Sequence, residues 1–325
     1  LAASTELETI PRNAIESLLA LKLNHYRIDV QPSASEWLEK FKHDLKASID
    51  LKLALEIALH IADPKDIDNF CASVTEHHPA IARIILLSVD HPATTQEIID
   101  HADRLRRHFP NVEIGGGTDY NYRELNCNLF DASNLDFVSY CVDPQEHATD
   151  DLTIIENIAA QADTIHSARD LYGESKPVSI TSLTLKKRFN PAATVSKDRV
   201  LTTAQRADPR QKTAFAAAFT LGSIKMMAQC DANSVTLFQT VGSQGILSGK
   251  GEKYPVYNVL SEILSAGTEL VHTTSDQPLQ ADGILLQKNA ELKLFLVNYT
   301  SATKDVVFGK RFFTLQPYEI RVESI

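Results

Sequence analysis

The chain alternates short apolar runs with longer amphipathic stretches, and this alternation constrains its fold more than any other feature. We expect strands at the short, continuous apolar runs, because these are too brief to form buried helices. Strands spaced in this way, with room for a helix between each pair, are typical of parallel sheets. The seven predicted strands are His25–Val30, Leu53–Leu59, Arg83–Ser88, Val112–Gly115, Asp136–Val142, Pro177–Leu183 and Ser234–Phe238.

Helices are predicted between these strands, because apolar residues there recur at spacings of three and four, as Ile154, Ile155 and Ile158 do. Strands joined by helices form right-handed βαβ units. Seven of them predict a (β/α)8 TIM barrel whose first strand lies upstream or is degenerate. An open doubly wound sheet is the alternative. The predicted helices are Pro11–Leu21, Ser35–Ser48, Ile67–His77, Thr95–His108, Asp150–Ala168, Pro209–Ala228 and Tyr254–Ser265.

The pattern changes from about Gln277, where short alternating runs are joined by polar turns and no helical pattern separates them. This predicts a small antiparallel β domain packed on the barrel. We therefore divide the chain into a TIM-barrel catalytic domain at 1–270 and a C-terminal antiparallel β domain at 271–325. The runs in question are Gly283–Gln287, Glu291–Tyr299, Asp305–Phe308, Phe312–Leu315 and Glu319–Val322.

The net charge limits the partners that the chain can bind. Its 32 lysines and arginines stand against 42 aspartates and glutamates, a formal net charge of -10. A polyanion would be repelled, so we expect neither nucleic acid nor an anionic membrane as a partner. No stretch reaches the roughly 18 apolar residues that a membrane span needs. Four cysteines without C-x-x-C spacing predict reduced thiols and a cytoplasmic protein.

A glycine run at the end of the fourth predicted strand marks a candidate site. Gly115–Gly117 carry no Cβ, so the backbone there can turn sharply and come close to a ligand. Chemistry in a parallel barrel lies at the carboxyl ends of the strands, where the next polar residues fall. Among them Glu124 is a candidate general acid or base, with a solvated loop carboxylate as the alternative. The candidates from this stretch are Asp119, Glu124 and Asn126.

The first predicted strand carries His25, Arg27 and Asp29 at alternate positions. Residues two apart on a strand point to the same side, so all three face one side of the sheet. If that side is the barrel interior, three ionisable groups face the pocket. The alternative is an Arg–Asp ion pair that only plugs the barrel.

Later strand ends add four more candidates. Gln145 and His147 follow the fifth predicted strand, and capping of the next helix explains neither of them. His147 can move a proton near neutral pH. A long irregular loop, from about residue 184 to residue 211, follows the sixth strand, and such loops often cover a site. Within it, Arg188 and Asn190 can bind a carboxylate or hydroxyl groups.

No metal or cofactor site is predicted. The His77-His78 pair, and His60 with Asp63, are placed on helices or connecting loops and lack the ligand spacing of known metal sites. The sequence contains no Walker A, G-x-S-x-G or H-E-x-x-H motif. We therefore expect chemistry carried by side chains alone.

The strand-end motifs, taken in order from about Leu21 to Gly245, resemble those of the D-apionate lactonase family. That family consists of TIM-barrel hydrolases that open the lactone ring of D-apionolactone to give D-apionate, and its members carry additional β structure. The motifs that carry the resemblance are His25-Tyr-Arg-Ile-Asp29, Ile114-Gly-Gly-Gly-Thr-Asp119, Glu124-Leu-Asn126, Pro144-Gln145, His147-Ala148, Asp150-Asp151, Thr184-Leu185, Arg188-Phe-Asn-Pro191, Asp208-Pro-Arg-Gln211 and Thr240-Val-Gly242.

The resemblance implies hydrolytic attack on a lactone carbonyl, without a cofactor, in a small carbohydrate substrate. Glu124 or His147 would act as general base on water, and an arginine would stabilise the oxyanion. The family has a glutamate where the last strand of this chain has Gln239, so we include that position among the catalytic candidates. The implied substrate-binding residues are His25, Arg27, Asp29, Asp119, Asn126, Gln145, Arg188 and Asn190.

Two alternatives keep the barrel and change the activity. A retaining glycoside hydrolase needs two carboxylates about 5–5.5 Å apart, and Glu124 can supply one of them. A carbohydrate-binding protein without catalysis is the other, since Gln239 is an amide and does not take up a proton at neutral pH. The second alternative predicts that Gln239→Glu regains turnover.

Overall fold

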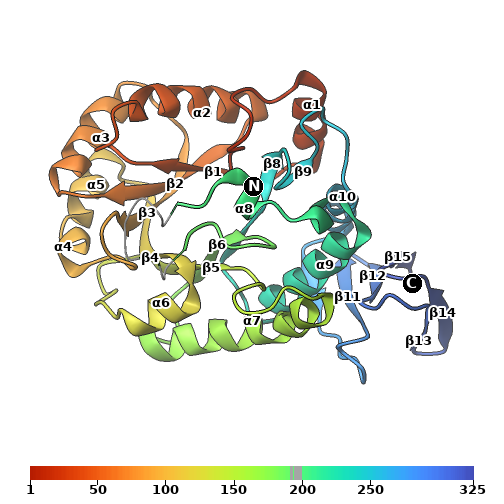
Figure 1. Cartoon of the computed structure of the whole chain (residues 1–325). Coiled ribbons are helices and arrows are strands. Elements are labelled where there is room, and N and C mark those ends of the chain that lie inside the picture. The colour runs from red at the N-terminus through yellow and green to blue at the C-terminus, as the bar shows by residue number, and fades with distance from the viewer. Residues whose placement is uncertain (191–192, 194–199) are drawn as a thin grey trace.

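Seven parallel strands lie side by side in chain order, β1 to β7, and curve into a barrel inside a ring of helices (Figure 1). The structure is a computed structural model that describes residues 1–190, 193 and 200–325. The predicted barrel and its seven strands are confirmed. The strands are β1 (His25–Val30), β2 (Ala54–Ile61), β3 (Ile81–Ser88), β4 (Glu113–Asn121), β5 (Phe137–Val142), β6 (Val178–Leu183) and β7 (Ser234–Leu237).

The barrel is closed by the start of the chain, at a junction that we call the seam. After β7 the backbone continues into a short strand, β8 (Gln239–Val241), which pairs with β9 (Gly245–Leu247). Ala2 forms parallel bridges with both Arg27 of β1 and Gln239 of β8. Residues 1–3 therefore lie between β1 and β8, where the missing strand of the barrel was expected.

Hydrogen bonds hold the seam on both sides. The amide of Arg27 donates to the carbonyl of Leu1 over 2.9 Å, and the amide of Thr240 donates to the carbonyl of Ala2 over 3.0 Å. These bonds satisfy backbone groups that would otherwise be exposed at the edges of β1 and β8.

The helices of the outer ring follow the predicted pattern, with local differences. The stretch predicted as one helix at Thr95–His108 forms two helices, and Pro209–Ala228 is interrupted at Thr213. The interruption follows a 3-10 turn that Asp208 caps by accepting a hydrogen bond from the amide of Arg210. The helices are α1 (Arg12–Leu21), α2 (Trp37–Leu51), α3 (Lys65–Thr75), α4 (Gln96–Ile99), α5 (Ala102–His108), α6 (Tyr122–Cys127), α7 (Asp151–Tyr172), α8 (Thr203–Arg206), η2 (Pro209–Lys212), α9 (Ala214–Gln229) and α10 (Pro255–Ala266).

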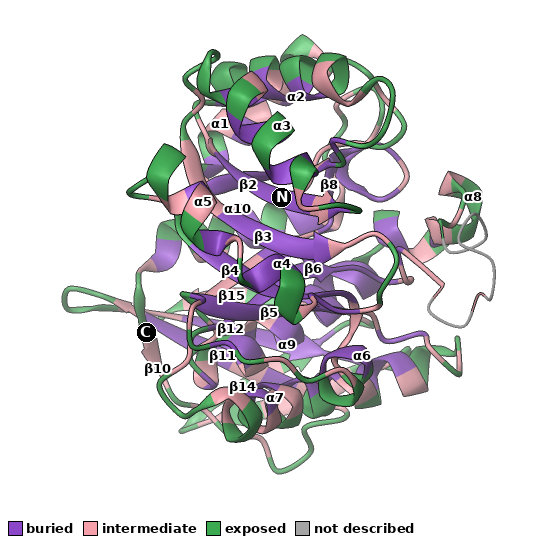
Figure 2. Ribbon diagram, turned by 90° about the vertical axis from the view of Figure 1, so that its left-hand side faces the viewer, coloured by how far each residue is buried: buried purple, intermediate pink, exposed green. Residues whose placement is uncertain are grey.

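The core lies mainly between the barrel and the helices, and the strands are its most buried part (Figure 2). Alternate residues such as Ile57, Leu59 and Ile84 belong to this outer core. The residues between them form a smaller apolar cluster, with Ala58 and Phe137 among its members. Side chains therefore alternate between two layers along each strand, as the pleat requires.

The glycine run lies within β4 and serves packing, which corrects the prediction that it forms a turn at the strand's exit. A Cβ on Gly115 would lie 2.3 Å from the ring of Phe137, and one on Gly117 would lie 1.8 Å from the carbonyl oxygen of Ser139. The glycines thus admit an aromatic ring into the interior and let β5 approach β4 closely.

The predicted C-terminal antiparallel domain is confirmed. It packs on α9, where a buried ion pair joins Nζ of Lys225 to Oδ1 of Asp282 over 2.5 Å. The strand β10 begins at residue 269 and crosses the predicted boundary at 270/271, so that boundary stays a prediction. The sheet contains β10 (Glu269–Val271), β11 (Ala281–Lys288), β12 (Glu291–Asn298) and β15 (Ile320–Ser324), and the hairpin contains β13 (Lys304–Phe308) and β14 (Arg311–Leu315).

Two observations concern the chain as a whole. Among the described helices, none combines the length and the apolar character that crossing a membrane would require. All four cysteines are free, with Cys127 exposed and the other three buried.

Candidate active site

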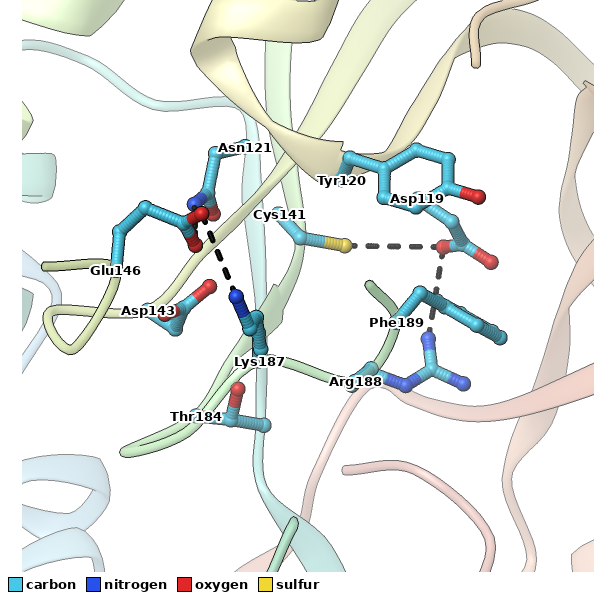
Figure 3. Close-up of a pocket in the computed structure, with 10 residues that line it drawn as sticks. All are labelled: Asp119, Tyr120, Asn121, Cys141, Asp143, Glu146, Thr184, Lys187, Arg188 and Phe189. Carbon is cyan, nitrogen blue, oxygen red and sulfur yellow. Dashed lines mark hydrogen bonds and ion pairs between the residues drawn. The ribbon is translucent and has the colours of Figure 1, made fainter. Parts of the chain in front are cut away.

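A polar pocket lies at the carboxyl ends of β4, β5 and β6 (Figure 3). This is the end of the barrel at which the sequence predicted a site, because loops after parallel strands converge there. The pocket combines three carboxylates with two cationic side chains. Its lining residues are Asp119, Tyr120, Asn121, Cys141, Asp143, Glu146, Thr184, Lys187, Arg188 and Phe189.

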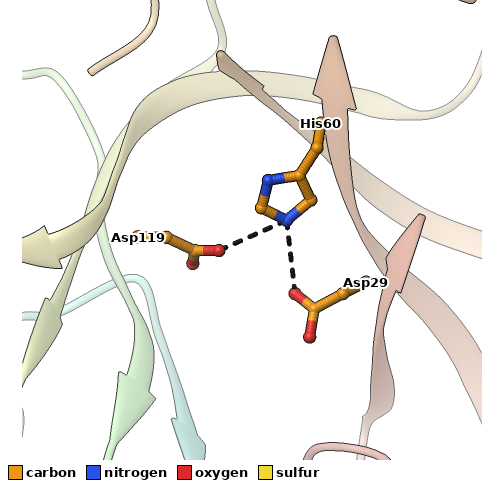
Figure 4. A group of neighbouring side chains, drawn as sticks. All are labelled: Asp29, His60 and Asp119. Atoms are coloured by element: carbon orange, nitrogen blue, oxygen red, sulfur yellow. Dashed lines mark ion pairs between the residues drawn. The ribbon is translucent and has the colours of Figure 1, made fainter. Parts of the chain in front are cut away.

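Five ionisable side chains form a network at one side of this pocket, which we call the carboxyl-end group: Arg27, Asp29, His60, Asp119 and Arg188. Nη2 of Arg27 lies 2.5 Å from Oδ1 of Asp119 and 3.1 Å from Oδ1 of Asp29. Nη2 of Arg188 lies 2.5 Å from Oδ2 of Asp29. Nε2 of His60 lies between the two carboxylates, 3.3 Å from Asp119 and 3.6 Å from Asp29 (Figure 4).

The arginines keep both carboxylates of this group ionised. Burial alone would raise the pKa of Asp29, but Arg188 and Arg27 hold it well below its ordinary value. Burial acts in the same direction on Asp119, and Arg27 and Arg188 again lower its pKa. The predicted Arg27–Asp29 ion pair is therefore present. Because the Asp29 side chain is 33% exposed, this group is partly accessible to solvent, and its role in binding stays a prediction.

His60 belongs to this group although the sequence placed it outside the strands. The second strand runs two residues further than predicted, so His60 is part of β2 and faces the interior beside Asp29 and Asp119. The three residues offer ligand atoms within 4.8 Å of one another, a spacing that a metal ion can use. Arg27 and Arg188 already neutralise the carboxylates, and a divalent cation would be repelled by both. We therefore assign no metal chemistry to this group.

The other side of the pocket holds two carboxylates and a lysine. Nζ of Lys187 lies 3.4 Å from Oε1 of Glu146, and the amide of Asn121 donates to Oε2 of Glu146 over 3.4 Å. Asp143 follows β5 directly, and its buried Oδ1 has no hydrogen-bond partner among the described residues. Burial, reinforced by the charge of Glu146, raises the pKa of Asp143 to about 7. This carboxyl group can therefore gain and lose a proton near neutral pH.

Sequence reasoning missed Asp143, Glu146 and Lys187 as site residues. The available signal was position, since Asp143 is the first residue after β5 and two residues before the selected Gln145. The side chain of Asp143 is half-buried with its Oδ1 atom shielded from solvent, an environment that no local pattern shows.

The structure separates three predicted residues from this pocket. Glu124 lies on α6, where its Oε1 is 2.6 Å from Nη1 of Arg123, a side chain that is 77% exposed. Asn126 is exposed on the same helix, and His147 is exposed in the loop after β5. None of the three is among the described residues that line the pocket. Their roles in the site stay predictions.

Gln145 holds loops together. Its Nε2 donates to the carbonyl of Leu185 and to Oδ2 of Asp208, and its Oε1 accepts a hydrogen bond from Arg210. These bonds tie the segment after β5 to the segment after β6. Asn190 is half-buried in that second segment. The rest of the predicted covering loop includes residues 191–192 and 194–199, which lie outside the described part of the chain.

Gln239 and His25 face other partners. Oε1 of Gln239 accepts a hydrogen bond from the amide of Thr5, and its Nε2 donates to Oγ1 of Thr5. His25 lies at the amino end of the barrel, with Nε2 2.6 Å from Oγ1 of Thr236 and 3.7 Å from Oε2 of Glu56. We call His25, Glu56, Arg83 and Thr236 the amino-end group. Its position leaves His25 apart from the other predicted binding residues.

A protein-family model described as D-apionate lactonase, TIM barrel domain, matches residues 1–268 of the chain. A D-apionate lactonase of Brucella anthropi is 28% identical over 299 residues, which cover 86% of this chain and 48% of that protein. The chain thus spans about half the length of this curated relative.

Solved structures of glycoside hydrolases share the fold. An α-L-arabinofuranosidase of family 51 from Bifidobacterium longum has a TM-score of 0.61 at 12% identity, with 99% of this chain and 87% of that chain covered. A GH30 endoxylanase from Clostridium papyrosolvens C71 has a TM-score of 0.60 at 10% identity, covering 94% and 82%. At such identities the likeness concerns the fold alone.

Proposed function

Because this chain belongs to the D-apionate lactonase family, through its TIM barrel domain, we propose that it hydrolyses a sugar lactone in carbohydrate metabolism. The observation that carries the proposal is the match over residues 1–268, which contains every residue that lines the pocket. The name of the curated relative supports D-apionolactone as the substrate and D-apionate as the product.

The pocket has the groups that this hydrolysis needs. Ring opening requires water to be deprotonated as it attacks the carbonyl carbon, and it requires the negative charge on the carbonyl oxygen to be stabilised. Carboxylates supply the first function, and the cationic groups of Lys187 and Arg188 supply the second. We assign the sugar hydroxyl groups to Asp119 through Oδ2, which forms no hydrogen bond among the described residues although Nε2 of His60 lies 3.3 Å away. No step calls for a cofactor.

Arg27 is not among the residues that line the pocket, but it contacts residues that border it. Its guanidinium group donates to Asp29, to Asp119 and to the carbonyl of Thr181, so its role is to hold those carboxylates in place. Arg188 reaches the pocket itself, held by Asp29 and stacked over the ring of Phe189 at 5.2 Å. We therefore assign the substrate oxyanion to Arg188 in preference to Arg27.

The proposal is tested by following hydrolysis of a panel of aldonolactones, including D-apionolactone, by NMR against the spontaneous rate. We expect selective acceleration of D-apionolactone opening, and loss of that acceleration in Arg188→Gln. Glu124→Gln tests one of the two bases that the sequence predicted. A fall of about 10²-fold in the rate of hydrolysis would return Glu124 to the mechanism. Saturable binding without turnover of any lactone would indicate a binding protein, and hydrolysis of aryl glycosides alone would indicate a glycosidase.

A further inference from the structure

We propose that Asp143, placed directly after β5 between Glu146 and Lys187, is the general base of the pocket and accepts a proton from the attacking water. The inference deepens the proposed lactone hydrolysis and rests on it. It assigns the base to a residue that the sequence did not select.

The first support is geometric. Asp143 follows the last residue of β5, which fixes its backbone at the carboxyl end of the barrel. Figure 3 shows its carboxyl group between Glu146 and Lys187, with Thr184 below. Its Oδ1 is buried without a hydrogen-bond partner among the described residues, so this atom is available to a water molecule. A buried acceptor left without a partner is costly unless a ligand or water satisfies it.

The second support is electrostatic. Six titratable groups line the pocket with this carboxyl group: Asp119, Tyr120, Cys141, Glu146, Lys187 and Arg188. Burial raises the pKa of Asp143 most, and the charge of Glu146 raises it further. A hydrogen bond from the backbone amide of Gln145, the charge of Lys187 and a hydrogen bond from the side chain of Asn121 lower it. The result, about 7, lies where a base is both partly ionised and basic enough to accept a proton at neutral pH.

The chemical step balances within the pocket. The oxygen of water forms a bond to the lactone carbonyl carbon while one proton of that water passes to the Asp143 carboxylate. The carbonyl oxygen takes the negative charge beside the cationic side chains. The carbonyl double bond then re-forms as the bond from the carbonyl carbon to the ring oxygen breaks, and protonated Asp143 gives its proton to that oxygen, which regenerates the base. The new carboxylic acid loses its own proton to solvent, which leaves a hydroxy carboxylate.

The first test compares Asp143→Asn with the wild-type chain on the lactone that the wild type opens fastest. We expect kcat/KM to fall by about 10²-fold or more. Glu97→Gln, an exposed carboxylate on α4, is the matched control and should keep the wild-type rate. The thermal midpoint of Asp143→Asn verifies that this variant is folded. Because a raised pKa makes the ionised carboxylate costly to the fold, this midpoint should exceed that of the wild type more at pH 8 than at pH 5.5.

The second test uses the pH profile of kcat/KM. If Asp143 had only a structural role, replacing its two charged neighbours would not shift this profile in opposite directions. Activity should rise with pH through the pKa of Asp143. Glu146→Gln removes a charge that raises this pKa, so the rise should move to lower pH. Lys187→Met removes a charge that lowers it, so the rise should move to higher pH. We expect each shift to be on the order of 0.5 pH unit or more, with Glu97→Gln unmoved.

The outcomes are distinguishable. An active wild-type chain with unchanged kcat/KM in Asp143→Asn overturns the assignment of the base and leaves the lactonase proposal standing. Shifts of the same sign in Glu146→Gln and Lys187→Met also overturn it. A wild-type chain that opens no lactone overturns the proposed function, and with it the role of Asp143 in that reaction.

Discussion

The barrel interior contains two groups of ionisable side chains, one at each end, and they use opposite electrostatic solutions. In the carboxyl-end group two arginines face two aspartates, and the pKa values of Asp29 and Asp119 are lowered. In the amino-end group burial dominates: it raises the pKa of Glu56, which is fully buried, and it lowers the pKa of His25. The first group is a network of ion pairs, whereas in the second the pKa values of Glu56 and His25 are shifted toward their neutral forms beside the cationic Arg83.

The same strands build both groups. Two-residue spacing in β1 places His25 in the amino-end group and Arg27 and Asp29 in the carboxyl-end group, and β2 contributes Glu56 and His60 in the same way. The two groups differ in their access to solvent. The carboxyl-end group borders the pocket, whereas in the amino-end group Glu56 is fully buried and Arg83 is 15% exposed. In barrels of this kind the carboxyl end carries chemistry and the opposite end carries stability. We expect mutations in the two groups to differ in how much they change stability and in how that change depends on pH.

The largest effect should come from Arg27→Met. This change leaves two buried carboxylates with one less cation, and breaking a buried ion pair from one side costs about 3–5 kcal/mol. Arg83→Met is the counterpart at the amino end, where the side chain is 15% exposed, and it should cost about 1–2 kcal/mol. Urea unfolding at pH 7 measures both. Equal losses would show that the two groups do not differ in the way proposed.

A smaller effect, of opposite sign in the two groups, should appear in the pH dependence of stability. Asp119 has a lowered pKa in the fold, so its ionised form stabilises above about pH 4 and that contribution is lost as pH falls. Glu56 has a raised pKa, so its contribution is present at low pH and is lost as pH rises. The advantage of wild type over Asp119→Asn should therefore shrink below about pH 4, whereas Glu56→Gln should gain on wild type as pH increases.

Unfolding free energies of the wild type and these two variants, measured from pH 3.5 to pH 8, check this sign difference. Parallel curves for the two variants would contradict it.

The smallest effect should come from Gln239→Glu. Gln239 lies at the carboxyl end, yet its amide is engaged on both atoms by Thr5 of the seam. The glutamate keeps the acceptor for the amide of Thr5 and loses only the donor. We expect kcat/KM within about threefold of wild type, as for a substitution that touches no reacting atom. A gain of tenfold or more would instead mark Gln239 as the lost carboxylate of a former catalytic pair.

Much of this architecture could be predicted from the sequence, because the spacing of apolar residues and the length of the apolar runs determine where strands and helices form. All seven barrel strands lie where apolar runs predict them, and β1 has the predicted bounds. Two features had no local signal. Residues 1–3, which pair with β1 and β8, show no period by themselves, and α6 follows β4 without the spacer that separates most elements.

The site was less predictable, for a different reason. Sequence shows which strand end a residue follows, and Asp119 and Arg188 were found in that way. It does not show where a side chain points, so Glu124 and His147 ranked above Asp143 although they lie outside the pocket lining. His60 was missed because the predicted second strand ended at Leu59, two residues before the end of β2, and therefore did not include it. Burial and direction are products of the tertiary fold, and the raised pKa of Asp143 follows from them.

The position of the seam determines when the barrel can close during folding. Its hydrogen bonds join the first residues to β8, almost the whole barrel apart in sequence, so the entropy of loop closure must be overcome before they contribute. The remaining strands pair with neighbours along the chain and can assemble without it. We expect barrel closure to be a late event, in which the amides of Arg27 and Thr240 gain protection from hydrogen exchange after those of β2 to β6. Early protection at Thr240 would instead make the seam part of the folding nucleus.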